Sequence, residues 1–347
     1  MRIRRTVPIF LTVVLVAAAV TLAVQLRKHA PPEPARLLPG ADAFFYIDLG
    51  KIRKANAGKE LPSVSHDPEY ERFIHETGFE FERDLDEAAF AVHYPGNWPG
   101  GGTGGSAPEP RFSEVLKGDF HGERLTAYLR QIAQAVENYQ SVDIFTIRVE
   151  GRSLRVAVLN ADLVAASNHD DPAVIRGIVD RSKRLASPFG GPALLRQFYK
   201  RVQLGSLAWV VARINPSAPG IGGLGGLLTT PATMVASGTY HSPLHPRLDA
   251  IHLRAEAYTG GTEEARAIID KVNVFVALSH SAESSAGMHG TDPDVKAFFD
   301  SIEVKQEGDR AVLNAALPFG FLRKMLADSG AGSSGTSTPA QVPPTSR

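Results

Sequence analysis

Apolar and polar residues alternate along several segments of the chain, which is the pattern of half-buried β-strands. In residues 142–149 the apolar side chains of Phe145, Ile147 and Val149 occupy every second position. Their neighbours would then point to the opposite face of a sheet. Other segments share the β-branched and aromatic content of strands, and the sequence predicts strands in residues 41–49, 87–94, 111–120, 142–149, 152–159 and 162–167.

Two other segments repeat their apolar residues at helical spacing. Residues 123–139 place Leu125, Leu129 and Ile132 on one face, and residues 172–181 carry a similar stripe. An Asp-Pro pair precedes three predicted helices, because the carboxylate can accept free backbone N–H groups and proline suits the first helical position. These pairs are Asp67-Pro68, Asp171-Pro172 and Asp292-Pro293.

The same order of strands, helix and hairpin follows again in the C-terminal part of the chain. The elements of this second set fall at residues 206–214, 233–240, 247–258, 262–278 and 302–317. Both hairpins turn on Glu-Gly, at Glu150-Gly151 and at Glu307-Gly308. The sequence therefore predicts an α+β fold with a mainly antiparallel sheet and helices on one face. It also predicts two similar halves, residues 37–200 and 201–329.

The N-terminal part of the chain contains an uncharged apolar run from Val7 to Leu26. A helix needs roughly 20 such residues to cross the hydrocarbon core of a membrane, so we expect a transmembrane anchor at residues 7–26. More basic residues precede this run than follow it, which favours a cytoplasmic stub at residues 1–6 and export of the remainder. A cleaved signal peptide ending near residues 21–23 is the alternative.

Polar segments rich in proline, glycine or serine border the predicted domain. Residues 27–36 predict a stiff linker, and residues 330–347 predict a disordered tail because they are poor in apolar side chains. Residues 94–110 predict a long mobile loop. Residues 37–329 would then form the exported domain of a single-pass inner-membrane protein. Its N-terminus would be cytoplasmic and its main domain periplasmic or extracellular.

The composition narrows the class of protein. The chain has no cysteine, so its fold uses neither disulfides nor thiolate metal ligands. The 37 Lys and Arg residues balance the 37 Asp and Glu residues, and the two signs are interspersed, which argues against a nucleic-acid partner. Every Asn-x-Ser/Thr sequence contains proline at its middle position, which favours a bacterial envelope over a eukaryotic secretory route.

Two stretches of the chain resemble a loose group of uncharacterised bacterial envelope proteins. These proteins have an N-terminal anchor or lipid, open their exported region with a strand of the form LP-x-AD, and close with helix, hairpin and helix. The corresponding stretches here are "LLPGADAFFYIDL" and "PDVKAFFDSIEVKQEGDRAVLNAALPFGFLRKML". The resemblance spans most of residues 37–327. It implies an extracytoplasmic location and this fold, and it carries no activity.

A glycine-rich segment, Gly220, Gly222 and Gly225, has the spacing G-x-G-x-x-G. A dinucleotide-binding loop must leave a strand directly and enter a helix whose N-terminus faces the pyrophosphate. Here Pro216 and Pro219 separate the segment from the preceding strand, and Pro231 follows two threonines. We therefore predict a flexible or partner-contacting joint, and no bound nucleotide.

Three clusters contain residue types that bind metals. They are His241, His245 and Asp249; His169, Asp170 and Asp171; and Glu76, Glu80, Glu82, Asp84, Asp86 and Glu87. Prolines prevent the first cluster from forming a helix with two histidines on one face, and Asp171 is already explained as a helix cap. The acidic stretch lacks the oxygen spacing of an EF-hand, so a solvated acidic face is the favoured interpretation over a cation site.

No segment has the spacing of a catalytic motif, and no G-x-S-x-G elbow occurs. The sequence therefore assigns no catalytic, cofactor-binding or metal-binding residue and no cofactor. The hypothesis that it favours is a membrane-tethered extracytoplasmic binding or scaffold protein of the cell envelope, with the membrane and an envelope protein as partners. The alternatives are an envelope hydrolase with an unrecognised site, and a carrier of a lipid or other hydrophobic ligand, which requires an apolar cavity between sheet and helices.

Overall fold

The computed structural model describes residues 30–55, 66–94, 110–149, 151–183, 190–214, 230–240, 250–285 and 293–321. Within these ranges, no helix is both long enough and apolar enough to cross a membrane. Several predictions concern residues outside the ranges: the anchor at 7–26, the tail at 330–347, most of the loop at 94–110, the glycine segment at 220–225, and His241, His245 and Asp249.

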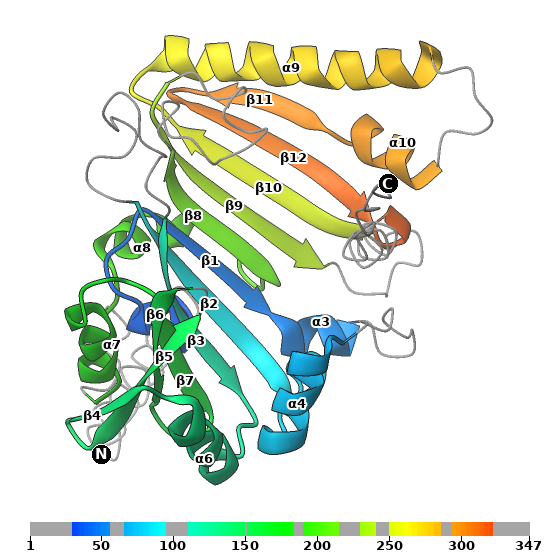
Figure 1. Cartoon of the computed structure of the whole chain (residues 1–347). Helices are drawn as coiled ribbons and strands as arrows, with labels where there is room; N and C mark the ends of the chain where they lie inside the picture. The colour runs from blue at the N-terminus through cyan, green and yellow to red at the C-terminus, as the bar shows by residue number, and fades with distance from the viewer. Residues whose placement is uncertain are drawn as a thin grey trace, which may run out of the picture.

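Twelve strands form the sheet of the described residues. They are β1 (Ala43–Asp48), β2 (Leu85–His93), β3 (Arg111–Gly118), β4 (Ala135–Tyr139), β5 (Val142–Val149), β6 (Arg152–Val158), β7 (Leu163–Ser167), β8 (Ala208–Ile214), β9 (Ala232–Tyr240), β10 (Ala250–Tyr258), β11 (Glu303–Glu307) and β12 (Arg310–Pro318). Their spatial order is β11-β12-β10-β9-β8-β1-β2-β3-β7-β6-β5-β4 (Figure 1). All neighbouring strands are antiparallel, as the sequence predicts.

The two halves of the chain join edge to edge in this sheet. Strand β1 pairs with β8 from Ala43↔Ala212 to Ile47↔Ala208. On each side of this junction the chain runs through three neighbouring strands, β1-β2-β3 or β8-β9-β10, and later adds a hairpin, β5-β6 or β11-β12. Strand β7 separates β3 from β6 in the first half, whereas β10 contacts β12 directly in the second. The order of elements is therefore similar in the two halves, and the first half has two additional strands, β7 and the edge strand β4.

Helices lie on both faces of the sheet, which corrects the prediction of helices on one face. They are α2 (Glu33–Leu37), α3 (Leu49–Ala55), α4 (Pro68–Thr77), α5 (Phe81–Asp84), α6 (Gly122–Ile132), α7 (Ala173–Lys183), α8 (Ala193–Phe198), α9 (Thr262–Ser285) and α10 (Pro293–Asp300). Along β2, Ala89 and Ala91 pack in the core with α2, α7 and α8. Ala88 packs with α6 and Val92 with α9. Because side chains alternate along a strand, these cores occupy opposite faces.

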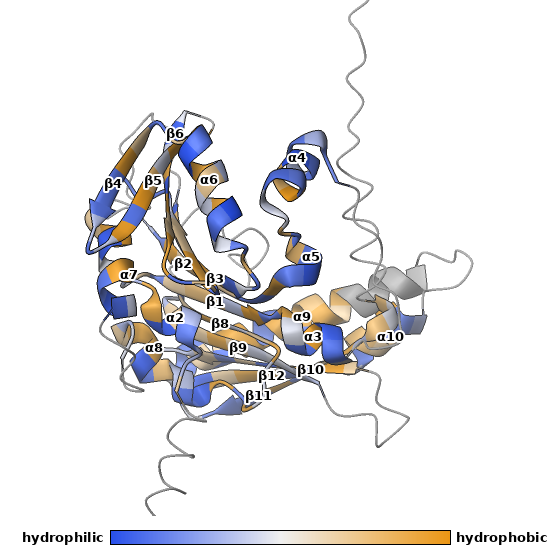
Figure 2. Cartoon of the chain, turned by 90° about the horizontal axis from the view of Figure 1, so that it is seen from below, coloured by the Kyte–Doolittle hydropathy of each residue, from blue (hydrophilic) through white to orange (hydrophobic). Residues whose placement is uncertain are grey.

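The apolar content of the strands explains this two-sided covering. Both alternating sets of β2 are apolar, since Ala89 and Ala91 are fully buried on one face and Ala88 is 2% exposed on the other. Figure 2 shows apolar residues along the central strands β1, β2 and β8. A sheet with two apolar faces must be covered on both, so helices from both halves of the chain are needed.

The predicted helix at 123–139 is too long. The helix α6 ends at Ile132, and residues 135–139 form the edge strand β4. The backbone N–H of Gln134 donates to the carbonyl of Thr146 at 2.8 Å, and β4 then pairs with β5. Val136 matches a helical stripe only by coincidence of spacing, and its side chain is 47% exposed.

The predicted linker at 27–36 is wrong for its C-terminal part. Residues Glu33–Leu37 form α2, with Pro34 in the first turn where a missing N–H costs nothing. Ala35 is fully buried and Leu37 is 4% exposed. Arg181 of α7 donates from Nε to the carbonyl of Leu37 at 2.6 Å. Tertiary contacts therefore fold a segment whose composition alone predicts a spacer.

The Asp-Pro helix starts are confirmed where the structure describes them. Asp67 accepts hydrogen bonds from the backbone N–H groups of Glu69 and Tyr70 at 2.9 and 2.8 Å. Asp171 accepts one from Ala173 at 2.8 Å. Asp292 lies outside the described residues. In the two hairpins, Gly151 and Gly308 have φ of 81° and 65°, a backbone conformation that favours glycine.

Candidate functional site

An apolar cavity lies between the sheet of the second half and the helices α9 and α10. Its volume is about 270 Å³. The sheet provides the floor through β9, β10, β11 and β12, and the two helices provide the walls. The lining residues include Met234, Leu253, Ala257, Ile268, Val272, Phe275, Phe298, Phe299, Val304, Ala311, Leu313 and Ala315.

Small side chains on the floor create this space. In the register of β10 and β12, Ala257 faces Ala311, and the next two pairs on the same face are Ala255↔Leu313 and Leu253↔Ala315. Every one of these pairs contains an alanine, so the side chains of the sheet leave unfilled space beneath α9. The walls are bulky by comparison, because Phe298 and Phe299 of α10 stand beside the floor with their ring centroids 5.3 Å apart.

Among the described residues of the lining, Glu256 is the only ionisable one, and its side chain belongs to the other face of the sheet. It alternates with Ala255 and Ala257 along β10, and it pairs with Arg254 at 2.8 Å and with Arg310 at 3.1 Å. Hydrogen bonds and these cations outweigh burial and lower the pKa of Glu256. The described residues of the lining therefore present apolar side chains to the cavity.

The cavity reaches the surface beside α9. Phe275 lines it and is nevertheless 48% exposed, so this ring stands at the opening. Val274 and Leu278, on neighbouring positions of α9, are 59% and 63% exposed. A row of large apolar side chains in contact with water is unusual unless something covers it. The opening is therefore bordered by apolar surface.

The structure also brings a serine and a histidine together, as a hydrolase would require. The ring nitrogen Nε2 of His93 lies 2.9 Å from Oγ of Ser113. Burial, and then the nearby His169 ring, lower the pKa of His93 to about 4, so the imidazole is neutral at neutral pH. Ser113 is fully buried, and its hydroxyl is shared with Ser167 at 2.9 Å. A substrate carbonyl cannot reach this hydroxyl, so the pair is a structural network.

The cluster His169, Asp170 and Asp171 has structural contacts at each residue. Nδ1 of His169 accepts from the backbone N–H of Asp171 at 3.1 Å. Asp170 forms an ion pair with Arg111 at 3.0 Å, and Asp171 begins α7. These contacts support the helix-cap interpretation of this cluster.

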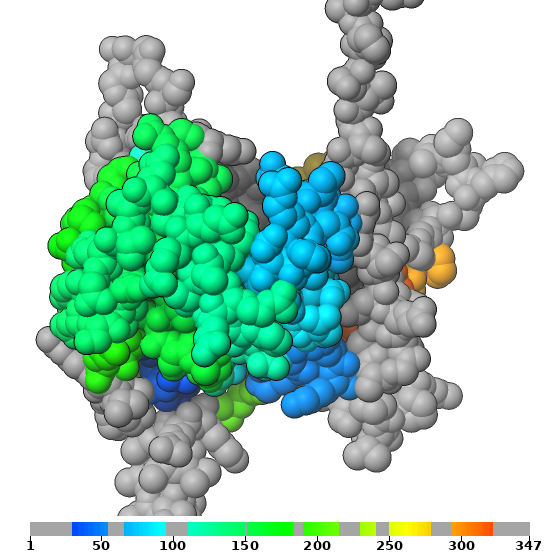
Figure 3. Space-filling model, turned by 60° about the horizontal axis from the view of Figure 1, so that its bottom comes forward, coloured from blue at the N-terminus to red at the C-terminus, as the bar shows by residue number. Residues whose placement is uncertain are grey.

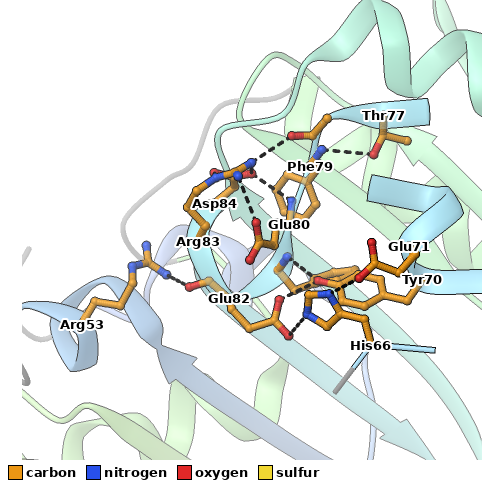
Figure 4. Close-up of polar contacts among 12 residues, drawn as sticks. Arg53, His66, Tyr70, Glu71, Thr77, Phe79, Glu80, Glu82, Arg83 and Asp84 are labelled. Carbon is orange, nitrogen blue, oxygen red and sulfur yellow. Dashed lines mark hydrogen bonds and ion pairs between the residues drawn. The ribbon is translucent and has the colours of Figure 1, made fainter. Parts of the chain in front are cut away.

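The acidic stretch does not form one solvated face. Glu76 and Asp86 are half exposed, and Arg53 pairs with Asp86 at 2.5 Å. Asp84 is 12% exposed and pairs with Arg83, and Glu87 accepts from the hydroxyl of Tyr46 at 2.9 Å. Only Glu80 and Glu82 point to a common place, where a residue that the sequence analysis did not select, His66, joins them. Figure 4 shows this group between α4 and α5.

Comparisons with known proteins give a fold-level likeness at most. No family model matches the chain, and no curated protein matches it. Among solved structures, two crystal forms of TP0453 are similar. Form III has a TM-score of 0.43 and form IV of 0.41, each at 10% identity and covering 86% of this chain. The matched parts are 99% and 97% of the TP0453 chains.

Proposed function

We propose that this protein is a membrane-tethered extracytoplasmic binding protein of the cell envelope that carries a hydrophobic ligand, the acyl chain of a lipid, in the cavity beneath α9 and α10. The observation that carries the proposal is the lining, in which every described side chain that faces the cavity is apolar. A site of this kind selects for apolar volume and offers no directional hydrogen bond.

The size and the apolar lining of the cavity support this ligand class. A closed apolar cavity of roughly 150 Å³ stays dry and binds a molecule such as benzene. The cavity here, about 270 Å³, is larger and open at one side. Each methylene group that moves from water into it contributes about 0.8 kcal/mol. A chain that enters beside Phe275 can leave its polar end in water.

The tether supports a role at a membrane. The apolar run at residues 7–26 would hold the domain close to a bilayer, with the N-terminus in the cytoplasm and the domain outside it. A ligand from that bilayer would then reach the exposed apolar side chains of α9 over a short distance. At this location the domain would also meet other envelope proteins, and one of them would be the partner that receives the bound lipid.

The experiment is equilibrium binding of a solvatochromic fluorescent fatty acid to the full chain in polymer-bounded membrane discs, with Ala311→Phe as the variant that fills the cavity. Ala277→Phe is the matched control, because it adds the same ring to α9 at an exposed position. We expect saturable binding to the unchanged chain and to the control, displaced by unlabelled fatty acid, and binding at least tenfold weaker in Ala311→Phe. Equal binding by all three proteins would overturn the proposal.

A further inference from the structure

His66, Glu80 and Glu82 are brought together by a reversal of the chain between α4 and α5. Asp67 caps α4 directly after His66, and Gly78, with φ of 75°, ends that helix. The chain then returns along the start of the same helix. The rings of Tyr70 and Phe73 lie 5.7 and 5.8 Å from the ring of Phe81 and hold the two helices together.

The imidazole of His66 is oriented by a carboxylate. Its Nδ1 lies 2.9 Å from Oε1 of Glu71, an oxygen that can only accept from it. The other nitrogen, Nε2, faces Glu82. It lies 3.7 Å from Oε1 of Glu82, which is too long for a hydrogen bond. The His66 side chain is 19% exposed, and its ring edge packs against Tyr70 with centroids 4.7 Å apart.

Each of the two glutamates is oriented through one of its oxygens. The hydroxyl of Tyr70 donates to Oε2 of Glu82 at 2.6 Å, and Arg83 donates to Oε2 of Glu80 at 2.9 Å. Figure 4 shows these contacts arranged around the His66 ring.

We propose that His66 Nε2, Glu80 and Glu82 bind a zinc ion. One ligand atom of each residue lies within 4.8 Å of the others, and atoms bound to one tetrahedral zinc ion at 2.0–2.1 Å are about 3.4 Å apart. The two carboxylate side chains would have to rotate toward the ion to close this difference. A water molecule would occupy the fourth position, as in sites with three protein ligands.

The ligand set selects the metal. An imidazole nitrogen suits zinc and other first-row transition metals, whereas calcium and magnesium prefer oxygen ligands alone. The contact between Glu71 and Nδ1 matches the carboxylate–histidine–metal arrangement that holds histidine ligands in place. Glu71 is therefore a positioning residue, and it does not bind the ion itself.

A metal here would fasten α4 to α5 on the surface of the first half. The helix α4 also packs against α6, where the rings of Phe73 and Tyr128 lie 5.6 Å apart, and Figure 3 shows the outer surfaces of these segments in contact. An ion bound by residues before α4 and at α5 would stabilise this whole layer. This site is independent of the apolar cavity, which lies under α9 and α10.

The test is zinc binding by the full chain in detergent, measured by isothermal titration with ZnCl₂ after treatment with a chelator. His66→Gln removes the nitrogen ligand, and His75→Gln is the matched control, because His75 lies on α4 with 87% of its side chain exposed. We expect the unchanged chain and the control to bind one zinc ion more than His66→Gln. Equal stoichiometry and affinity in all three proteins would overturn the site.

A second variant separates binding from folding. Glu71→Gln leaves the three ligands in place and removes the carboxylate from Nδ1, so we expect zinc affinity to fall about 10- to 100-fold. The melting temperature without zinc should stay close to that of the unchanged chain in both variants, and zinc should raise it only where the site is intact. A zinc-dependent rise of the same size in His66→Gln would contradict the proposal.

Discussion

Ala311 shows how a single small side chain determines the chemistry of a site. It is 5% exposed and faces Ala257 across the strand pair β12–β10. Larger residues at both positions would fill the space under α9, as they do elsewhere in the sheet. Sequence reasoning could not find this cavity, because the alanines are far apart in the chain and meet only through the register of the strands.

Substitution of leucine for Ala311 tests whether this space is free. We expect the free energy of unfolding of Ala311→Leu to stay within about 0.5 kcal/mol of the unchanged protein, or to rise, because the side chain enters an unfilled cavity. At Ala89, which is fully buried in the other core and does not line this cavity, the same change should cost about 1–3 kcal/mol through overpacking. Chemical denaturation measures both values. If leucine at position 311 lowered the free energy of unfolding as much as leucine at position 89, the cavity could not accept an acyl chain.

The cap at Asp67 supports the zinc site as well as α4, since it follows His66 directly. We expect Asp67→Ala to lower the free energy of unfolding by about 1 kcal/mol, because two backbone N–H groups lose their acceptor. Asp67→Asn keeps a cap oxygen and should lose much less. Urea unfolding of the two variants decides this, and an equal loss in both would exclude the cap as the cause.

His93 links stability to pH. Burial, then the charge of His169, lower its pKa from 6.5 to about 4, while Asp42 has a smaller opposing effect. As the pH falls from 6.5 to 4, His93 gains a proton in the unfolded chain but stays neutral in the folded chain. The free energy of unfolding therefore decreases as the pH falls through this window. His93→Gln should flatten the decrease, as measured by unfolding at a series of pH values. A decrease of unchanged slope would assign the effect to other groups.

At the scale of elements, the sequence predicts the strands well and the helices less well. Alternation identifies β5, whereas apolar runs with β-branched and aromatic residues identify β1, β2 and β8. The end of α6 was missed because Val136 fits both periods, and only pairing with β5 selects the strand. The helix α2 was missed because its burial depends on Arg181 and the core beneath α7. His66 was missed because α4 separates it in sequence from Glu80 and Glu82.

The helix α9 should be uneven in stability along its length. Ala265 and Ile268 in its first turns are at most 4% exposed, whereas Val274, Phe275 and Leu278 are about half exposed or more. We expect amide hydrogen exchange to be slow near residues 265–268 and faster near 273–278. Added fatty acid should slow exchange in the second segment. Uniform exchange along α9, unchanged by fatty acid, would contradict the assignment of this segment to the opening.

At the scale of the whole molecule, one continuous sheet runs through both halves of the chain, and each half carries a different candidate binding site. The first half carries the polar group of α4 and α5, and the second carries the apolar cavity of α9 and α10. Strands β1 and β8 join the halves in the middle of the sheet. In the proposed binding protein, the C-terminal half holds the ligand, and the N-terminal half continues the sheet that forms the floor of its cavity.

The most direct test of this account is to find where a hydrophobic ligand binds. The full chain in membrane discs is incubated with a photoactivatable fatty acid, irradiated and digested, and the labelled peptides are identified by mass spectrometry. We predict labelling on β10, β12, α9 and α10, lost in Ala311→Phe and retained in Ala277→Phe. Labelling spread over the exposed surface, or unchanged by filling the cavity, would contradict the assignment of the cavity as the ligand site.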